Sequence, residues 1–211
     1  MPRPLSAIIV PSLFLLFFSC ADGASGALSA TGTVVFDFKD AESAPAQRLA
    51  VFVQLDGDVR RCGGLTVSNA GSGLSWAVSK PEIFTGQNRG YACSLNLGAP
   101  YDEPIPDGKY AVMYTDASGD EDIVDFSVAY DKALLSSTSG TCRDFVPGAS
   151  ENVAIYDGAG VLLFMGRPRA SWGTSEDVLR DYKLAQTKRV CYLGSENTVI
   201  CLMPPESLRD D

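Results

Sequence analysis

The chain has 211 residues, and its 26 acidic and 17 basic side chains give it a formal net charge of −9 at pH 7. This length accommodates one domain with a sizeable core, and the acidic balance gives no basic surface for nucleic acid, so we expect no nucleic-acid partner. Histidine is absent, which removes the usual base of serine and cysteine nucleophiles and the common ligand of catalytic zinc, so we predict no catalytic residue, metal site or cofactor.

An apolar run at the start of the chain, from Ile8 to Cys20, stops abruptly at the cysteine. About a dozen apolar residues behind the basic Arg3 are too few to cross ~30 Å of hydrocarbon as a helix, but they match the core of a signal peptide. We therefore predict a signal peptide over residues 1–19 and a folded chain outside the cytoplasm. A transmembrane helix is the weaker alternative.

Within this run, Leu16-Phe17-Phe18-Ser19-Cys20 resembles the lipobox of bacterial lipoproteins, in which a small residue precedes an acylated cysteine. The resemblance implies that Cys20 is lipidated, becomes the mature N-terminus and anchors the protein to a membrane of the bacterial cell envelope, on its periplasmic or its surface face. In the commonest form of the motif, a Leu and a small residue stand where this chain has Phe17 and Phe18. The alternative is an ordinary secretory signal that is cut within residues 21–30 and discards Cys20.

The residues after the cysteine change from small and aperiodic to alternating. Residues 21–31 contain Gly, Ala and Ser without periodicity, so we predict a flexible tether over residues 20–32. From Thr33 onwards the apolar residues recur with a period of two, which is typical of strands. The strands predicted in this part are residues 33–38, 49–55, 64–67, 74–78 and 91–97. Short strands separated by turn residues, without intervening helices, indicate a mainly β fold, an antiparallel β-sandwich or barrel.

The clearest local prediction is a β-hairpin over residues 105–130. Its first strand, residues 109–115, follows the turn-forming Pro106-Asp107-Gly108, and its second strand covers residues 123–130. Each strand places aromatic and branched side chains on one face, so the hairpin can close a core. The segment Pro-Asp-Gly-Lys-Tyr-Ala-Val resembles the start of a strand in immunoglobulin-like, fibronectin-like and transthyretin-like extracellular sandwiches, which implies the same architecture here.

The loop of this hairpin, Asp116–Asp122, carries oxygen-bearing side chains at alternate positions, which partly match an EF-hand-type calcium loop. Two positions differ from that loop: Glu121 replaces the glycine of the sharp turn, and Ser127 replaces the bidentate acidic ligand. A charged, solvated hairpin tip explains the same residues. We therefore expect a simple turn, with calcium binding as the alternative.

The C-terminal third predicts a second group of elements. In chain order, these are a long connection with a possible sub-boundary at residues 136–150, a hairpin at 153–165, a helix at 175–187, strands at 189–193 and 198–203, and a charged tail at 206–211. The helix is predicted because Thr174 precedes acidic residues in the first turn and basic residues follow at the end. The strands before and after it complete a single mainly β domain over residues 33–205.

One loop combines an aromatic residue with basic residues. Trp172 lies beside Arg167 and Arg169 in an otherwise acidic protein. Because loops on a rigid scaffold commonly carry binding residues, these three form our candidate recognition patch. The alternative is a loop held in place by one packed tryptophan. Trp76, in contrast, alternates with apolar neighbours and is expected in the core.

The strongest cysteine prediction concerns the last two strands. Export would place the chain where disulfides persist. A hairpin centred on Glu196 would set Cys191 directly opposite Cys201, at a separation that a disulfide can bridge, so we predict this bond.

The other three cysteines cannot all pair once Cys20 is committed to lipid. We favour a bond between Cys62 and Cys93, which leaves Cys142 as a free thiol, and the alternative is Cys62 with Cys142. A metal cluster is disfavoured because the chain lacks histidine and closely spaced cysteine pairs.

Together these features predict a lipid-anchored cell-envelope protein that acts as a binding or structural module and not as an enzyme. Its expected partners are the membrane, through a covalent lipid, and an envelope or host protein or a glycan. The alternative is a small envelope hydrolase that uses paired carboxylates, since that chemistry needs no histidine. A cleft that holds two close carboxylates with perturbed ionisation would favour the hydrolase.

Overall fold

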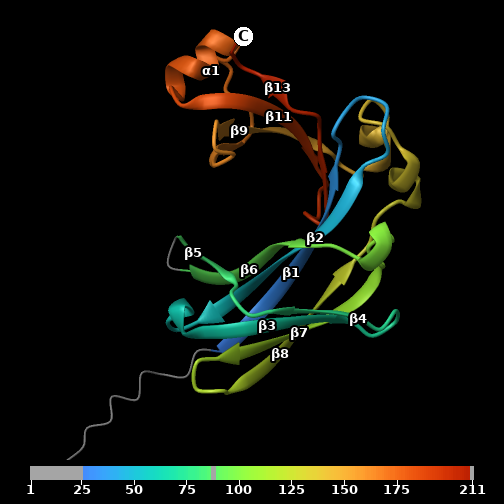
Figure 1. The fold of residues 1–211 in the computed structure, drawn as a ribbon, viewed down its shortest axis with the longest axis vertical. Helices are drawn as coiled ribbons and strands as arrows, with labels where there is room; N and C mark the ends of the chain where they lie inside the picture. The colour runs from blue at the N-terminus through green and yellow to red at the C-terminus, as the bar shows by residue number, and fades with distance from the viewer. Residues whose placement is uncertain (1–25, 87–88, 210–211) are drawn as a thin grey trace, which may run out of the picture.

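The computed structural model describes residues 26–86 and 89–209, and it is mainly β-strand with an α-helix near the C-terminus, as the sequence predicts (Figure 1). The predicted signal peptide and Cys20 lie outside the described residues, so both remain predictions. Within those ranges, no helix is both long enough and apolar enough to cross a membrane.

The strands of this part of the chain form one sheet of nine strands and one of four. They are β1 (Gly26–Asp37), β2 (Ala46–Asp56), β3 (Cys62–Asn69), β4 (Leu74–Val78), β5 (Glu82–Gly86), β6 (Arg89–Leu97), β7 (Gly108–Asp116), β8 (Glu121–Val128), β9 (Ser150–Asp157), β10 (Leu162–Gly166), β11 (Ala185–Leu193), β12 (Val199–Leu202) and β13 (Glu206–Ser207). The helix is α1 (Ser175–Asp181), and the 3-10 turns are η1 (Val59–Arg61), η2 (Pro100–Asp102), η3 (Lys132–Ser136) and η4 (Cys142–Phe145).

The larger sheet has the order β10-β9-β11-β12-β1-β2-β6-β5, with β13 paired to β11, and the smaller sheet has the order β4-β3-β7-β8. Figure 1 shows the smaller sheet at one end of the molecule, α1 with β9, β11 and β13 at the other end, and β1 and β2 running between them. The described pairs are antiparallel, except that β1 and β12 run parallel.

The main core lies between the two sheets. It is built from alternate residues of each strand, such as Val34 and Phe36 of β1 and Tyr110 and Val112 of β7, which have at most 1% of their surface exposed. This alternation explains why a period of two located the strands. Trp76 packs against the edge of this core, as predicted, and its indole nitrogen donates to the Gly98 carbonyl at 2.7 Å.

The predicted hairpin of residues 105–130 is confirmed by the pairing of β7 with β8. Tyr110 lies opposite Phe126 in the register, and their rings stack with centroids 5.0 Å apart. The Tyr110 hydroxyl donates to the Pro106 carbonyl, and the Tyr130 hydroxyl donates to the Ile105 carbonyl. The aromatic residues of the hairpin therefore serve the core and fix the turn before β7.

The predicted tether is wrong over residues 26–32, because β1 begins at Gly26 and pairs with β2 along this segment. The small residues there allow close packing and not flexibility. A Cβ placed on Gly32 would lie 2.0 Å from Cε2 of Phe126, so only glycine lets β8 lie against β1 at this point. Residues 20–25 lie outside the described residues.

The helix is correctly placed but shorter than predicted. Thr174 and Asp177 form a capping box at its start, as the sequence indicated. The helix ends at Asp181 and not at residue 187, because Tyr182 leaves helical geometry and Ala185, which is fully buried, already belongs to β11.

Two strands were not predicted. Every residue of β5 is exposed, so the segment lacks the apolar alternation that identifies a strand. The predicted charged tail is wrong over residues 206–208: Glu206 and Ser207 form β13, and Leu208 is buried in a small cluster with Val178 of α1. The pairing with β11, the burial of Leu208 and the hydrogen bonds of Arg209 to the carbonyls of Ala185 and Lys183 hold this segment.

The predicted disulfide between Cys191 and Cys201 is wrong, because the two side chains lie on opposite faces of the sheet. The hairpin exists, but its register pairs Cys191 with Leu202 and Tyr192 with Cys201. Asn197 takes a left-handed φ of 57° in the turn, and the pairing is displaced by one residue from the one we expected. Because side chains alternate, this displacement puts Cys201 in the main core and Cys191 on the other face of the sheet.

The prediction of a bond between Cys62 and Cys93 is also wrong. Cys62 packs against the main core. Cys93 lies opposite Phe52 in the register, whereas its neighbour Ala92 points into the main core. The side chain of Cys62 therefore faces the core between the sheets, whereas that of Cys93 lies on the other side of the larger sheet.

Candidate functional site

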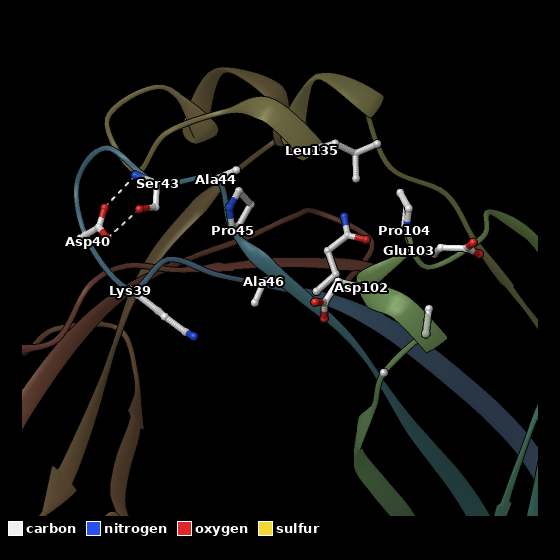
Figure 2. A pocket seen from close by; sticks show the side chains of 13 residues that line it. Lys39, Asp40, Ser43, Ala44, Pro45, Ala46, Asp102, Glu103, Pro104 and Leu135 are labelled. Carbon is white, nitrogen blue, oxygen red and sulfur yellow. Dashed lines mark hydrogen bonds between the residues drawn. The ribbon is translucent and has the colours of Figure 1, made fainter.

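A pocket of about 520 Å³ that could hold a ligand lies between the β1–β2 loop and η2 (Figure 2). Figure 2 shows Asp40 and Ser43 on one side and Asp102 and Glu103 on the other. The hydrogen bonds of Asp40 lie within its own loop. Its carboxylate accepts them from the Ser43 hydroxyl and from the Ser43 and Glu42 backbone nitrogens. These hydrogen bonds lower the pKa of Asp40, the bond from the Ser43 side chain most of all.

The opposite wall of this pocket is formed by an unusual backbone turn. Tyr101 and Asp102 have φ values of 57° and 56°, in the left-handed region that residues other than glycine seldom adopt. Two successive residues of this kind are strained and are typically held in place by their surroundings. The turn leaves the Tyr101 side chain 96% exposed next to Asp102 at the pocket wall.

A second pocket of about 420 Å³ adjoins the first, and Lys39, Ala46 and Gln47 line both. Gln47 accepts a hydrogen bond at Oε1 from the Ile105 nitrogen, but its buried Nε2 has no partner among the described residues. An unpaired buried donor is unfavourable, so an acceptor on a ligand would stabilise this amide.

The second pocket is cationic. Its charged side chains are Lys39, Arg48, Arg189 and Asp37, three basic and one acidic, in a protein whose net charge is −9. Nη1 of Arg48 lies 2.7 Å from one carboxylate oxygen of Asp37, and Nη2 of Arg189 lies 2.6 Å from the other. Burial by itself would raise the pKa of Asp37, but the hydrogen bonds and charges of Arg189 and Arg48 outweigh it and lower that pKa. Asp37 thus stays ionised and holds both guanidinium groups in place.

Part of each guanidinium remains available. Arg189 uses Nε to donate to the Met203 carbonyl at 2.5 Å, and its Nη2 reaches the carbonyls of Phe38 and Leu202 at 3.0 and 3.2 Å. Three guanidinium nitrogens make no hydrogen bond to the described residues and are accessible to solvent: Nη1 of Arg189 and Nε and Nη2 of Arg48. These donors could bind a carboxylate, phosphate or sulfate in the forked geometry that arginine favours.

The strand pattern explains how these charges meet. Asp37, Arg48 and Arg189 each lie two residues along a strand from an apolar residue of a buried cluster on the same face of the larger sheet. We call this the outer face, since the main core covers the opposite one. Its cluster consists of Val35, Ala50, Cys191 and Leu202, with Phe52, Leu95 and Ile200 partly buried against them. The cationic pocket therefore adjoins this apolar cluster.

The predicted recognition patch is only partly assembled. Trp172 and Arg169 are in contact, but mainly with groups of the protein itself: the guanidinium carbon lies 5.2 Å from the Trp172 ring centroid, and both side chains bind Asp181 at 2.8 Å. Phe164 and Tyr182 pack on the same tryptophan. These contacts hold the loop against α1. Arg167 is exposed, and whether the patch binds a partner remains a prediction.

The loop with the partial calcium motif is closed by its own hydrogen bonds. Asp116 has a buried side chain that accepts from the Ser118 nitrogen and hydroxyl and from the Asp120 nitrogen, and it pairs with Arg61 at 3.3 Å. The hydrogen bond from the Ser118 side chain is the main cause that lowers the pKa of Asp116 to about 2. No group of three or more acidic or cysteine side chains in the described ranges is arranged to hold a metal ion.

No protein-family model, curated protein or solved structure matches this chain. The cationic pocket was not predicted from the sequence. Asp37 and Arg189 are separated by 152 positions, and each looked like an ordinary strand-end charge. Asp37 and Arg48 alternate with the core-facing residues of β1 and β2, so the sequence places them on the outward side of each strand, where charges are ordinary. Their meeting with Arg189 depends on the pairing of the strands, which the sequence pattern does not signal.

Proposed function

We propose that this protein is a lipid-anchored binding module of the bacterial cell envelope, and that it holds an anionic group of its ligand in the cationic pocket. The observation that carries the proposal is that Arg48 and Arg189 both pair with Asp37 and keep free hydrogen-bond donors at the cationic pocket. An acidic protein that gathers three basic side chains in one pocket favours anions at that position against its overall charge. The proposed ligand group is a carboxylate, phosphate or sulfate on an envelope or host protein or on a glycan.

The ionisation of the carboxyl groups supports binding over hydrolysis. A carboxylate hydrolase needs one acid whose pKa is raised so that it can donate a proton. Among the described residues, each carboxyl group with a shifted pKa has it lowered, as for Asp37 and Asp40. Such groups act as fixed hydrogen-bond acceptors and ion-pair partners.

The anchor is tested by replacing Cys20 with alanine in the full-length chain. We expect the wild type to partition into the detergent phase of a cell-envelope extract and Cys20→Ala to move to the aqueous phase, because the acyl chains supply the membrane affinity. Cys62→Ala serves as the matched control and should stay with detergent. A wild-type protein in the aqueous phase, with an N-terminus beyond residue 20, would contradict lipidation.

The pocket is tested by titrating inorganic phosphate at constant ionic strength and following backbone amide signals by NMR. We expect saturable shifts at Gln47 and Asn96, which line the pocket. Arg48→Gln should weaken binding about tenfold, since it removes a charge-assisted hydrogen bond. Arg180→Gln, which changes an exposed arginine of α1, should leave the affinity unchanged. Shifts spread over the whole surface, or equal effects of the two variants, would refute the pocket as the binding site.

A further inference from the structure

Two buried cysteines lie next to each other in the main core. Cys142 is the first residue of η4, in the long connection between β8 and β9, and Cys201 lies on β12. Neither side chain has any exposed surface, and both belong to the cluster between the sheets. The connection and the strand are far apart in sequence, so this contact is created by the fold.

Cys142 packs against the core-facing side of β12, next to Met203. Cys201 and Met203 lie two residues apart and both face the main core, whereas Leu202 faces the other side of the sheet. Sγ of Cys142 lies 4.0 Å from Sδ of Met203 and donates to the Ser139 carbonyl at 3.5 Å. The thiols of Cys142 and Cys201 also lie within interaction range of each other.

The two thiols are chemically unequal. The neighbouring thiol of Cys201 lowers the pKa of Cys142 against the opposing effect of burial, and the same contact together with burial raises the pKa of Cys201. In the folded protein Cys142 is therefore the member of the pair that ionises first.

The remaining cysteines of the described chain are not arranged to compete. Cys93 and Cys191 lie on the outer face of the larger sheet, away from the core that holds the pair. Cys62 packs at the edge of the core, but its thiol contacts its own strand, at the Gly64 carbonyl. Thus the fold brings together one pair that sequence spacing did not suggest.

We propose that Cys142 and Cys201 are joined by a disulfide in the exported protein, formed by exchange with a disulfide oxidant of the envelope. The proposal rests on the export that forms part of the proposed function. The thiolate of one of the two cysteines attacks one sulfur of the oxidant and releases its other sulfur as a thiolate. The second cysteine, once deprotonated, then attacks the sulfur of the first and releases the second oxidant thiolate. The two cysteine thiols are oxidised, the oxidant disulfide is reduced to two thiols, and the two protons end on those thiols.

The bond would tie the connection of residues 131–149 to β12 and would close the long loop from residue 142 to residue 201. Because both sulfurs are buried, the exchange occurs while the chain folds. A loop of this length restricts the unfolded chain strongly, so the oxidised protein should melt about 10 °C above the reduced one.

The pairing is tested first in vitro. The purified full-length chain is denatured, reduced, refolded with oxidised glutathione, alkylated and digested for mass spectrometry. Trypsin leaves Cys191 and Cys201 in one peptide, so a second protease must cut after Glu196. We expect a peptide of Cys142 linked to one of Cys201, and this link should be lost in Cys201→Ala and kept in Cys191→Ala. Recovery of residues 142 and 201 as alkylated thiols, or of other pairs, overturns the proposal.

The same digestion is applied to protein extracted from the envelope without reduction. A linked pair there supports the whole proposal. If the pair forms with glutathione but is found as thiols in the cell, the chain does not meet an oxidant, and the proposed export fails while the pairing holds. The melting temperatures of the oxidised and reduced wild type give an independent readout, and equal values would show that the bond does not act as a cross-link.

Discussion

Replacing Arg189 by alanine is expected to lower the free energy of unfolding by about 3 kcal/mol, among the largest effects of a single polar substitution in this protein. Arg189 is only 15% exposed, and it pairs with Asp37 while donating to three backbone carbonyls. Those carbonyls lie where β1 and β12 end. The variant would leave the carbonyls of Phe38 and Met203 without this donor, and the partly buried carboxylate of Asp37 with only Arg48 as an ion-pair partner. Urea unfolding would measure the loss.

Arg180→Ala is the matched control, because it removes an exposed arginine that pairs with Asp177 within α1. An exposed pair of this kind contributes little, so the loss should be under about 1 kcal/mol. Equal losses in the two variants would mean that Arg189 does not hold the end of the sheet.

The effect of Arg189→Ala should also depend on pH. The ion pairs lower the pKa of Asp37 below that of an unfolded carboxyl group, which is about 4. The stabilisation is therefore fully present above about pH 4 and is lost as the pH falls through the lowered folded pKa. We expect the difference between wild type and Arg189→Ala to be constant from pH 7 to pH 5 and to shrink at lower pH. A difference that does not change with pH would contradict the ion-pair explanation.

Replacing Gly32 by valine is expected to cost about 3 kcal/mol, at the upper end for overpacking a core. Gly32 is buried in β1, and its added Cβ would lie 2.0 Å from the ring of Phe126 in β8. Valine is favourable in a strand, so strand propensity does not account for the loss. Gly86→Val is the matched control, because no atom of the described residues lies within 4 Å of a Cβ placed on Gly86. Thermal and urea unfolding would give both values.

A double-mutant cycle tests the cause. Phe126→Ala alone should cost about 3 to 5 kcal/mol because it leaves a cavity in the core. In Gly32→Val with Phe126→Ala, the valine fills part of that cavity, so the combined loss should be clearly smaller than the sum of the two single losses. Additive losses would show that Gly32 and Phe126 do not compete for the same space.

The two pockets differ in the kind of ligand that they suit. The pocket beside Asp40 carries Asp102 and Glu103, whereas the adjoining pocket carries Arg48 and Arg189. A ligand that spans both would present an anionic group to the arginines and a neutral or cationic group to the acidic wall. This arrangement gives specificity by charge, because a ligand bound in the reverse orientation would meet like charges on both sides.

The sequence by itself determined the local structure wherever neighbouring residues carry the information. Alternating apolar residues located most of the strands, Pro106 and Gly108 located the turn before β7, and Thr174 with Asp177 located the start of α1. These features depend on backbone preferences and on side-chain direction within one element, which are the same wherever the element lies in the fold. The mainly β fold with one helix near the C-terminus follows from them.

The tertiary structure decided everything that depends on which strands become neighbours. The small residues of 26–32 form a strand because β2 pairs with them and β8 packs over Gly32. A one-residue difference in register moved Cys191 away from Cys201. The cationic pocket needs β1, β2 and β11 in one sheet to bring Arg48 and Arg189 to the same carboxylate. Long-range pairing is set by the joint burial of many side chains, so no single segment of the sequence contains it.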